Sequence, residues 1–197
     1  MPAPAQTRNS NGLDQFFASL QGQTNLSVLD LSGASQANIS FITDLGCRLY
    51  SDDIVRTLND AFGQGDFVAN QADPARAGQF LRDSLNFPDG HFDGALVWDA
   101  LQFLAPPLLQ LTVDHLHRIL RPQACLLAFF SAEEKAQTLP VYNYRIADSK
   151  TLTLTTRDER RPAQFFSNRA LEKLFQEFRS VKFFLTRDHL REVIVKR

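Results

Sequence analysis

The stretch that decides the fold is Leu26 to Ser35, which reads LSVLDLSGAS. Its first residues form a near-continuous apolar run that includes the adjacent pair Val28 and Leu29, instead of alternating apolar and polar residues. A run of this kind predicts a strand that is buried on both faces, in the middle of a parallel sheet covered by helices. We expect this strand to end at Asp30, before a turn and a helix.

The turn that follows, Ser32 to Ser35, consists of small residues. Small residues let the backbone approach a ligand closely, and the helix after the turn presents unpaired N–H groups. Open α/β sheets bind ligands just beyond the carboxyl ends of their strands. The carboxylate of Asp30 would therefore either hold a polar group of a ligand or tie the amides of its own turn, and the sequence leaves both interpretations open.

Length and composition favour a soluble, cytoplasmic protein. A chain of 197 residues with 44% hydrophobic residues and 17 Phe is enough for one domain with one core. The longest apolar run, residues 124–130, is too short to span a bilayer, and the first residues show no signal-peptide pattern. Cys47 and Cys125 form no CxxC pair and no Cys/His cluster, so we expect buried thiols and no metal site.

The net charge of −1 hides an asymmetry between the two halves of the chain. Residues 1–98 carry 5 Arg and 11 Asp, a net charge of −6, while residues 99–197 carry 16 Lys and Arg against 11 Asp and Glu, a net charge of +5. A basic half can mark a polyanion partner. Because these charges are spread over predicted helices and turns, we expect no nucleic-acid binding.

The remaining pattern predicts alternating strands and helices. We expect a disordered lead over residues 1–11 and a single domain over residues 12–197. Further strands are predicted at 47–51, 79–85, 94–101 and 124–130, a hairpin at about 140–157, and an antiparallel pair at 181–186 and 191–196. Helices are predicted at 13–20, 35–45, 54–62, 106–120 and 167–178.

This order of elements resembles the class I S-adenosylmethionine (SAM) dependent methyltransferase family over nearly the whole chain. Four segments resemble the motifs of that family in the right order: VLDLSGAS, LYSDDI, FLRDSLNFPDGHFDGALVWDALQFL and HRILRPQACLLAFF. The resemblance implies an α/β, three-layer, Rossmann-like sheet of seven strands. That sheet would be mostly parallel with an antiparallel last strand, helices on both faces and a small hairpin insertion after strand five.

The resemblance also implies SAM as the cofactor and assigns roles to matched positions. The implied cofactor-binding residues are Asp30, Ser32, Gly33, Ala34, Asp52, Asp53, Asp83, Ser84 and Trp98. The group from Asp30 to Ala34 would face the methionine part of SAM, an acid after the second strand would hold the ribose hydroxyls, and the pair at 83–84 would lie against the adenine.

Two of these assignments leave alternatives. Asp52 and Asp53 point in different directions, so one would hold the ribose and the other would cap the next helix; we favour Asp52 for the ribose. Trp98, at the end of the fourth strand, fits the edge of the core better than a platform for the substrate.

Methyl transfer needs in-line positioning and in some enzymes a general base. Asp99, at the end of the fourth predicted strand, is the candidate base, and its alternative role is to cap or brace a turn. Tyr142 and Tyr144 alternate on one face of the predicted hairpin, where they would form either an aromatic lid or a packing face.

The sequence therefore predicts a SAM-dependent methyltransferase that acts on a small molecule, as a monomer or homodimer. The rival prediction is a non-catalytic protein of the same fold that serves as a binding or assembly module. It is motivated by the turn, because Ser32, Ala34 and Gln36 stand where the family carries glycine.

Overall fold

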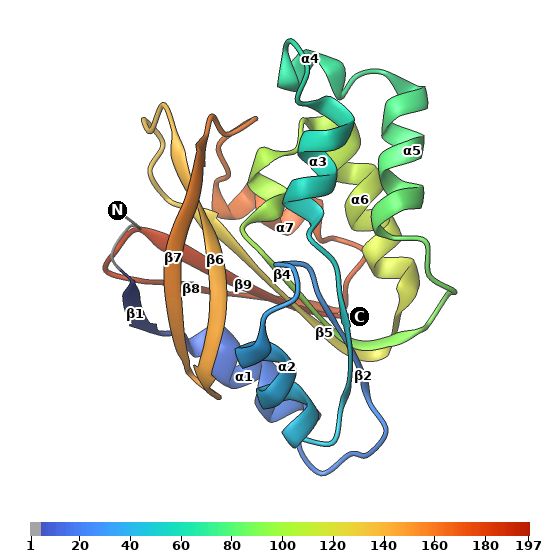
Figure 1. Ribbon diagram of the computed structural model, residues 1–197, viewed down its shortest axis with the longest axis vertical. Coiled ribbons are helices and arrows are strands. Elements are labelled where there is room, and N and C mark those ends of the chain that lie inside the picture. The colour runs from blue at the N-terminus through green and yellow to red at the C-terminus, as the bar shows by residue number, and fades with distance from the viewer. Residues whose placement is uncertain (1–4) are drawn as a thin grey trace.

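The structure is a computed structural model that describes residues 5–197. Its main feature is a six-stranded sheet with the order β3-β2-β4-β5-β9-β8 (Figure 1). Its strands are β2 (Ser27–Asp30), β3 (Arg48–Ser51), β4 (Phe92–Trp98), β5 (Leu120–Ser131), β8 (Ser180–Leu185) and β9 (Leu190–Lys196). The strands β2 to β5 run parallel, whereas β9 is antiparallel to both of its neighbours. A mostly parallel sheet with an antiparallel last strand confirms the sequence prediction.

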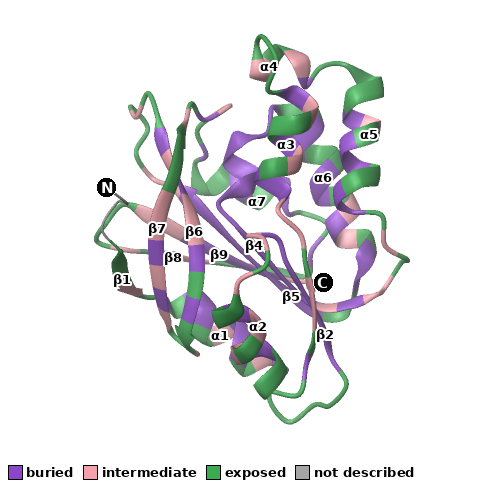
Figure 2. Ribbon diagram, viewed as in Figure 1, coloured by how far each residue is buried: buried purple, intermediate pink, exposed green. Residues whose placement is uncertain are grey.

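Other elements cover both faces of this sheet (Figure 1). One face carries α1 (Asn11–Leu20), α2 (Gln36–Asp44) and a second sheet of three strands in the order β1 (Gln6–Asn9), β7 (Thr151–Arg160), β6 (Leu139–Asp148). The other face carries α3 (Ile54–Phe62), α4 (Phe67–Asn70), α5 (Pro74–Ser84), the short 3-10 helix η1 (Ala100–Phe103), α6 (Pro106–Ile119) and α7 (Asn168–Leu174). Each face has its own apolar core, and Figure 2 shows the buried residues in purple on either side of the sheet.

The strand β2 lies between β3 and β4, and all four of its residues are buried. Its neighbouring residues point in opposite directions: Val28 belongs to the core under α1 and α2, and Leu29 belongs to the core on the other face. The continuous apolar run of the sequence therefore reflects burial on both faces, as predicted.

The strand predicted at residues 79–85 is wrong, because this segment forms most of α5. The helix begins after Asp73, whose side chain caps it, and buries Ala77, Phe80, Leu81 and Ser84 at the spacing i, i+3, i+4, i+7. The main sheet consequently has one strand fewer than the seven expected. No strand lies between β3 and β4 along the chain. Helices connect them, and of these α3 and α5 lie on the face of the sheet opposite α2.

The amino-terminal segment also differs from the prediction of a disordered lead. Residues 1–4 lie outside the described residues, but Gln6–Asn9 forms β1, which pairs antiparallel with β7. The guanidinium of Arg8 forms ion pairs with Asp188 at 2.9 Å and with the buried Glu192 at 3.0 Å. Because β1 pairs with β7, the predicted hairpin of β6 and β7 is part of a three-stranded sheet.

Both cysteines, Cys47 and Cys125, are buried free thiols, as predicted. Within residues 5–197, no helix combines the length and the hydrophobicity that crossing a bilayer requires.

Candidate functional site

The carboxyl ends of β2 and β4 lie side by side in the middle of the main sheet, with Asp30 opposite Leu96. From β2 the chain continues outward to β3, whereas from β4 it continues to β5 on the other side. The direction of winding reverses between β2 and β4, and open α/β sheets form their ligand-binding crevice at such a point. We refer to the region bounded by Asp30, the turn at 32–35 and Trp98 as the crevice.

The carboxylate of Asp30 is fully buried and receives four hydrogen bonds from the protein itself. Ser32 donates from its backbone N at 3.0 Å and from its hydroxyl at 2.8 Å. The side-chain amide of Asn38 donates at 2.8 Å, and the indole Nε1 of Trp98 donates at 2.7 Å. Three of these bonds end on Oδ1 and one on Oδ2. Because a carboxylate offers about four acceptor positions, most of its capacity is used within the protein, and Asp30 braces its turn and holds Trp98.

The turn after β2 closes against the end of β3. Gly33 has a φ of +87°, whereas Ser32 and Ala34 are not among the residues with positive φ, so the glycine-poor sequence carries no backbone strain. The backbone N of Gly33 donates to the carbonyl of Asp52 at 2.9 Å. A Cβ atom added at Gly33 would lie 3.3 Å from the Cβ atom of Asp53, so the turn packs tightly on the acidic pair.

The two acidic residues after β3 have different partners. Asp53 caps α3 by accepting a hydrogen bond from the backbone N of Arg56 at 3.0 Å. Its carboxylate also pairs with the guanidinium of Arg157, at 3.1 and 2.9 Å. Asp52 is half-buried, and burial raises the pKa of its carboxyl group. Asp53 is thus the capping residue of the pair, and the assignment of the ribose acid to Asp52 stays a prediction.

The hairpin of β6 and β7 lies across the crevice. The amide of Asn38 donates to the carbonyl of Tyr144 at 3.1 Å and accepts from the backbone N of Ile146 at 2.8 Å. The ring of Tyr144 stacks on Trp98, with centroids 4.7 Å apart and planes 10° apart. These contacts, with the pairing of Arg157 to Asp53, attach the hairpin to α2, β4 and α3. Tyr144 is therefore a packing residue, and Trp98 is part of the core.

The structure does not bring Asp83 and Ser84 to the crevice. Both residues lie near the end of α5, on the face of the sheet opposite α2 and the hairpin. Asp83 is exposed and accepts a hydrogen bond from Gln79 at 2.6 Å, while the hydroxyl of Ser84 donates to the carbonyl of Phe80 at 2.7 Å. Their hydrogen bonds are made within α5.

Asp99 follows Trp98, and its side chain does not cap η1. The residue is 3% exposed, and the hydrogen bond that it accepts from the backbone N of Tyr142 is long, at 3.4 Å. Burial raises the pKa of Asp99 to about 7, although the Tyr142 N–H and the nearby Tyr144 hydroxyl oppose this shift. A carboxyl group with such a pKa can accept or release a proton at neutral pH.

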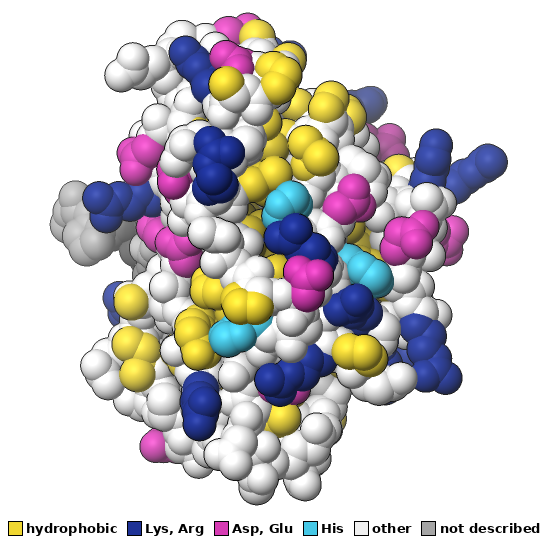
Figure 3. All heavy atoms as spheres, turned by 90° about the vertical axis from the view of Figure 1, so that its right-hand side faces the viewer, with side chains coloured by type: hydrophobic (Ala, Val, Ile, Leu, Met, Phe, Trp, Pro, Cys, Tyr) yellow, Lys and Arg dark blue, Asp and Glu magenta, His cyan; other side chains and the backbone are white. Residues whose placement is uncertain are grey.

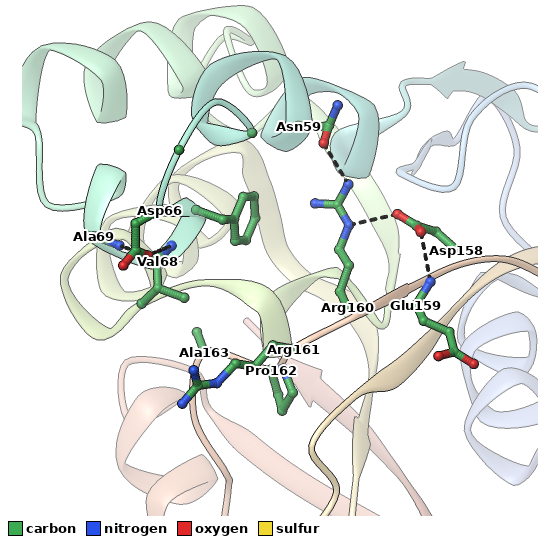
Figure 4. A pocket seen from close by; sticks show the side chains of 13 residues that line it. Asn59, Asp66, Val68, Ala69, Asp158, Glu159, Arg160, Arg161, Pro162 and Ala163 are labelled. Atoms are coloured by element: carbon green, nitrogen blue, oxygen red, sulfur yellow. Dashed lines mark hydrogen bonds and ion pairs between the residues drawn. The ribbon is translucent and has the colours of Figure 1, made fainter.

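An open hollow of about 820 Å³ lies between the end of α3, the short helix α4 and the end of β7 (Figure 4). Arg160 reaches across from β7 to the side chain of Asn59 at 3.1 Å, and its guanidinium lies 5.1 Å from the ring centre of Phe67. None of the predicted site residues lines this hollow. Arg160 instead provides a second attachment of the hairpin to α3.

Sequence reasoning missed Asn38 and Arg157. Asn38 is buried on the same side of α2 as Ile42, four residues later. A polar residue at an apolar position of a helix is a signal that the sequence contains, because buried polar groups need partners. Arg157 carries no comparable signal, since it stands in the exposed, charged end of β7.

No protein-family profile matches the chain, and no curated protein matches it significantly. Many solved structures do resemble it. A SAM dependent methyltransferase from Archaeoglobus fulgidus has a TM-score of 0.53 and 12% identity, over 94% of this chain and 91% of that one. A SAM dependent methyltransferase from Aquifex aeolicus has a TM-score of 0.51 and 13% identity, over 93% and 88%.

A third similar structure is the 1,6-didemethyltoxoflavin-N1-methyltransferase of Burkholderia thailandensis, with bound 1,6-didemethyltoxoflavin and S-adenosylhomocysteine. Its TM-score is 0.51 at 12% identity, over 94% of this chain and 76% of that one. The chain therefore has the class I SAM-dependent methyltransferase fold, as the sequence resemblance predicts, with six strands in its main sheet.

The residues that the resemblance assigns to SAM do not gather around one open site. The resemblance places the methionine part of the cofactor beside Asp30, where the indole of Trp98 is hydrogen-bonded instead. It places the adenine beside Asp83 and Ser84, which lie on α5 and make their hydrogen bonds within that helix.

Proposed function

We propose that this chain is a non-catalytic protein of the methyltransferase fold that works as a binding module. The observation that carries this proposal is the buried carboxylate of Asp30, which accepts four hydrogen bonds from the protein itself. In the arrangement that the resemblance implies, Asp30 and its turn face a ligand. In this chain they bond to Ser32, Asn38 and Trp98 and lie under the hairpin, so the crevice serves to hold the fold together.

The energy needed to open the crevice supports the same proposal. The hairpin contributes six buried apolar side chains, namely Leu139, Val141, Tyr144, Ile146, Leu152 and Leu154. Each buried side chain of this size stabilises by about 1.5–3 kcal/mol, so lifting the hairpin off would cost roughly 9–18 kcal/mol as an upper bound. A ligand that binds with a Kd of about 1 μM supplies only about 8 kcal/mol.

A second candidate function, a SAM-dependent methyltransferase that acts on a small molecule, is favoured by Asp99. A buried carboxyl group with a pKa of about 7 at the end of β4 has the properties of a general base. This function requires a conformation in which Trp98 leaves the space beside Asp30 and Asp52 becomes accessible to a ribose.

Calorimetric titration with SAM and with S-adenosylhomocysteine separates the two functions. We expect no binding heat for the wild-type protein or for Arg157→Ala, which frees the Asp53 carboxylate at little cost because that ion pair is partly exposed. Arg161→Ala, an exposed arginine four residues further along, is the matched control. Micromolar binding by the wild type would establish the second candidate, and binding by Arg157→Ala alone would show that the hairpin masks a retained cofactor site.

Nucleic acid is not the partner that we propose. Figure 3 shows Lys and Arg side chains interspersed with Asp and Glu over one face of the molecule, without a continuous basic surface on that face. Several of the basic groups are neutralised locally, including Arg118 by Asp89 at 3.1 Å and Arg121 by Asp93 at 2.8 Å. Phosphate binding would need unpaired basic groups gathered along one path.

A further inference from the structure

A small cavity of about 160 Å³ lies beyond the carboxyl ends of β4 and β5, beside the crevice. Its walls come from η1, the end of β5, the first half of β6 and the turn between β8 and β9. A cavity of about 150 Å³ holds a molecule as large as benzene. None of the predicted cofactor-binding residues lines this cavity, so it is a separate place in the fold, and it goes beyond the function proposed above.

The wall of the cavity is acidic. Three carboxylates line it, from Asp99, Glu133 and Asp188, and no Lys or Arg is among its lining residues. Arg8 neutralises Asp188 from outside the cavity, at 2.9 Å, so Asp99 and Glu133 supply the negative charge. Among residues 5–197, no group of three or more His, Cys, Asp or Glu side chains is placed to hold a metal ion. The charge of this cavity therefore suits an organic cation better than a metal ion.

Two polar groups in the wall lack adequate partners within the described part of the chain. The Asp99 carboxylate is 3% exposed and forms no ion pair there. Tyr144 is 2% exposed, and its hydroxyl has no partner in good hydrogen-bond geometry except that it lies beside the Asp99 carboxylate, whose pKa it lowers. Buried polar groups left without partners are destabilising, so a ligand that pairs with both gains affinity.

Aromatic side chains form another part of the wall. The rings of Tyr142 and Tyr144 have centroids 6.0 Å apart and planes inclined at 74°, so they form a corner. A cation held within about 6 Å of such ring faces is attracted by their quadrupoles. Leu139 and Pro140 also line the cavity and offer apolar surface to an alkyl group.

We propose that this cavity binds a small primary alkylammonium ion, with Asp99 as its counter-ion. An ammonium group carries three N–H donors and no acceptor, which matches a wall of acceptors. One N–H pairs with the carboxylate of Asp99, a second pairs with the oxygen of Tyr144, and the alkyl group lies against Leu139 and Pro140.

The test is an NMR titration of the full chain with n-butylammonium chloride, with 1-butanol as the uncharged ligand of the same shape and sodium chloride to match ionic strength. We expect saturable shifts of amides around the cavity with a Kd below about 5 mM, in line with the efficiency of small ligands. 1-Butanol should bind at least about tenfold more weakly, because it cannot pair with a carboxylate. The absence of saturable shifts up to about 50 mM butylammonium, or equal affinity for the alcohol, would overturn the proposal.

Variants identify the counter-ion. Asp99→Asn should weaken butylammonium binding by roughly ten- to a hundredfold, the loss expected for a charge-assisted hydrogen bond. Tyr144→Phe should weaken butylammonium binding by roughly three- to tenfold. This second variant keeps the test decisive if Asp99→Asn fails to fold. Asp114→Asn, an exposed carboxylate on α6, should leave binding unchanged. Wild-type affinity in both cavity variants would disprove the assignment.

Binding should also depend on pH through Asp99, falling about tenfold per pH unit below pH 7 as this carboxyl group becomes protonated. The groups that face it are Tyr142 and Tyr144 on β6, Arg157 on β7, Glu133 after β5, and Asp188 and His189 in the β8–β9 turn. His189→Asn removes the one histidine from this set and should keep the profile. A flat profile in the wild type would contradict the role of Asp99.

Discussion

Asp99 is a residue whose environment destabilises its own charged form. Its carboxyl group has almost no contact with solvent and forms no ion pair among the described residues, and although Arg157 lowers its pKa, that pKa lies at about 7 instead of the ordinary 3.8. Ionisation of this group therefore opposes folding. A natural sequence keeps such a group where it has a use other than stability.

The first prediction is that Asp99→Asn stabilises the protein at pH 8 and not at pH 4. Below pH 3.8 the carboxyl group is neutral in both folded and unfolded states, and the wild type loses stability as the pH rises towards about 7. Each pKa unit corresponds to about 1.4 kcal/mol, so the difference between variant and wild type should grow to roughly 3–4 kcal/mol at most. Urea unfolding at steps between pH 4 and pH 8 measures it.

The exposed Asp114→Asn variant is the control for this series and should show no comparable trend. If the free energy of unfolding of Asp99→Asn differs from that of the wild type by the same amount at pH 4 and at pH 8, ionisation of Asp99 does not destabilise the folded state.

For single residues, the sequence predicts the place in an element better than it predicts the hydrogen-bond partners. It places Asp30 at the end of a buried strand, but its role depends on Trp98, which is 68 positions away, and no local pattern reports that contact. The turn shows the converse. Its sequence suggests strain at Ser32 and Ala34, yet Gly33 takes the positive φ, so the one glycine present stands where it is needed.

Among the elements, α5 shows why a short apolar segment is ambiguous. Residues 79–85 hold only three apolar side chains, and a window of seven residues covers only two helical turns, so the local pattern does not separate a strand from a helix. The signal that decides lies upstream, where Asp73 and Pro74 start a helix and Ala77 begins the buried spacing.

Two glycine substitutions test the local backbone, one in the helix α5 and one in the turn after β2. Gly78→Ala should raise the free energy of unfolding by about 0.5–1 kcal/mol, because alanine favours a helix interior and the nearest atom to the new Cβ is the flexible end of Arg82. Gly33→Ala should lower it by about 1 kcal/mol or more, since φ is +87° and Asp53 lies close. Thermal or urea unfolding gives both values, and destabilisation by Gly78→Ala would argue against the helix.

One side chain of α2, that of Asn38, bonds to the middle of the hairpin. Asn38→Ala should destabilise the protein by roughly 2–4 kcal/mol, because it leaves the backbone N–H of Ile146, the carbonyl of Tyr144 and one oxygen of Asp30 without this partner in a buried place. Asn143→Ala, a half-buried residue of β6, is the control and should cost less than about 1 kcal/mol. Equal losses in the two variants, measured by urea unfolding, would deny Asn38 its bridging role.

Across the whole molecule, the amino-terminal segment is tied to the interior of the main sheet. Glu192 on β9 is fully buried, and burial raises the pKa of its carboxyl group, against the effects of the Gly12 N–H and the Arg8 guanidinium. The backbone N of Gly12 donates to it at 2.6 Å, and Arg8 donates at 3.0 Å. The sequence predicts a disordered lead over residues 1–11, which includes Arg8, because contacts between the two ends of the chain have no local sequence signature.

A double-mutant cycle measures this connection. Arg8→Ala should lower the free energy of unfolding by roughly 3 kcal/mol, because it leaves a buried carboxylate without its cation. In a Glu192→Gln background the same substitution should cost clearly less, since no buried charge remains to be neutralised. Additive losses in the two single variants and the double variant would show that the ion pair has no energetic coupling.

The pairing of β1 with β7 also sets when the fold can be completed during synthesis. Gln6–Asn9 leaves the ribosome early, but its partner strand begins at Thr151, and Arg8 meets Glu192 184 positions along the chain. A ribosome that adds about 5–20 residues per second needs roughly 10–40 s to cover that distance. Throughout this interval the nascent amino-terminal strand is unpaired and open to chaperones and to other chains. The strand β1 is therefore translated long before its partners and reaches its native place only after they have emerged.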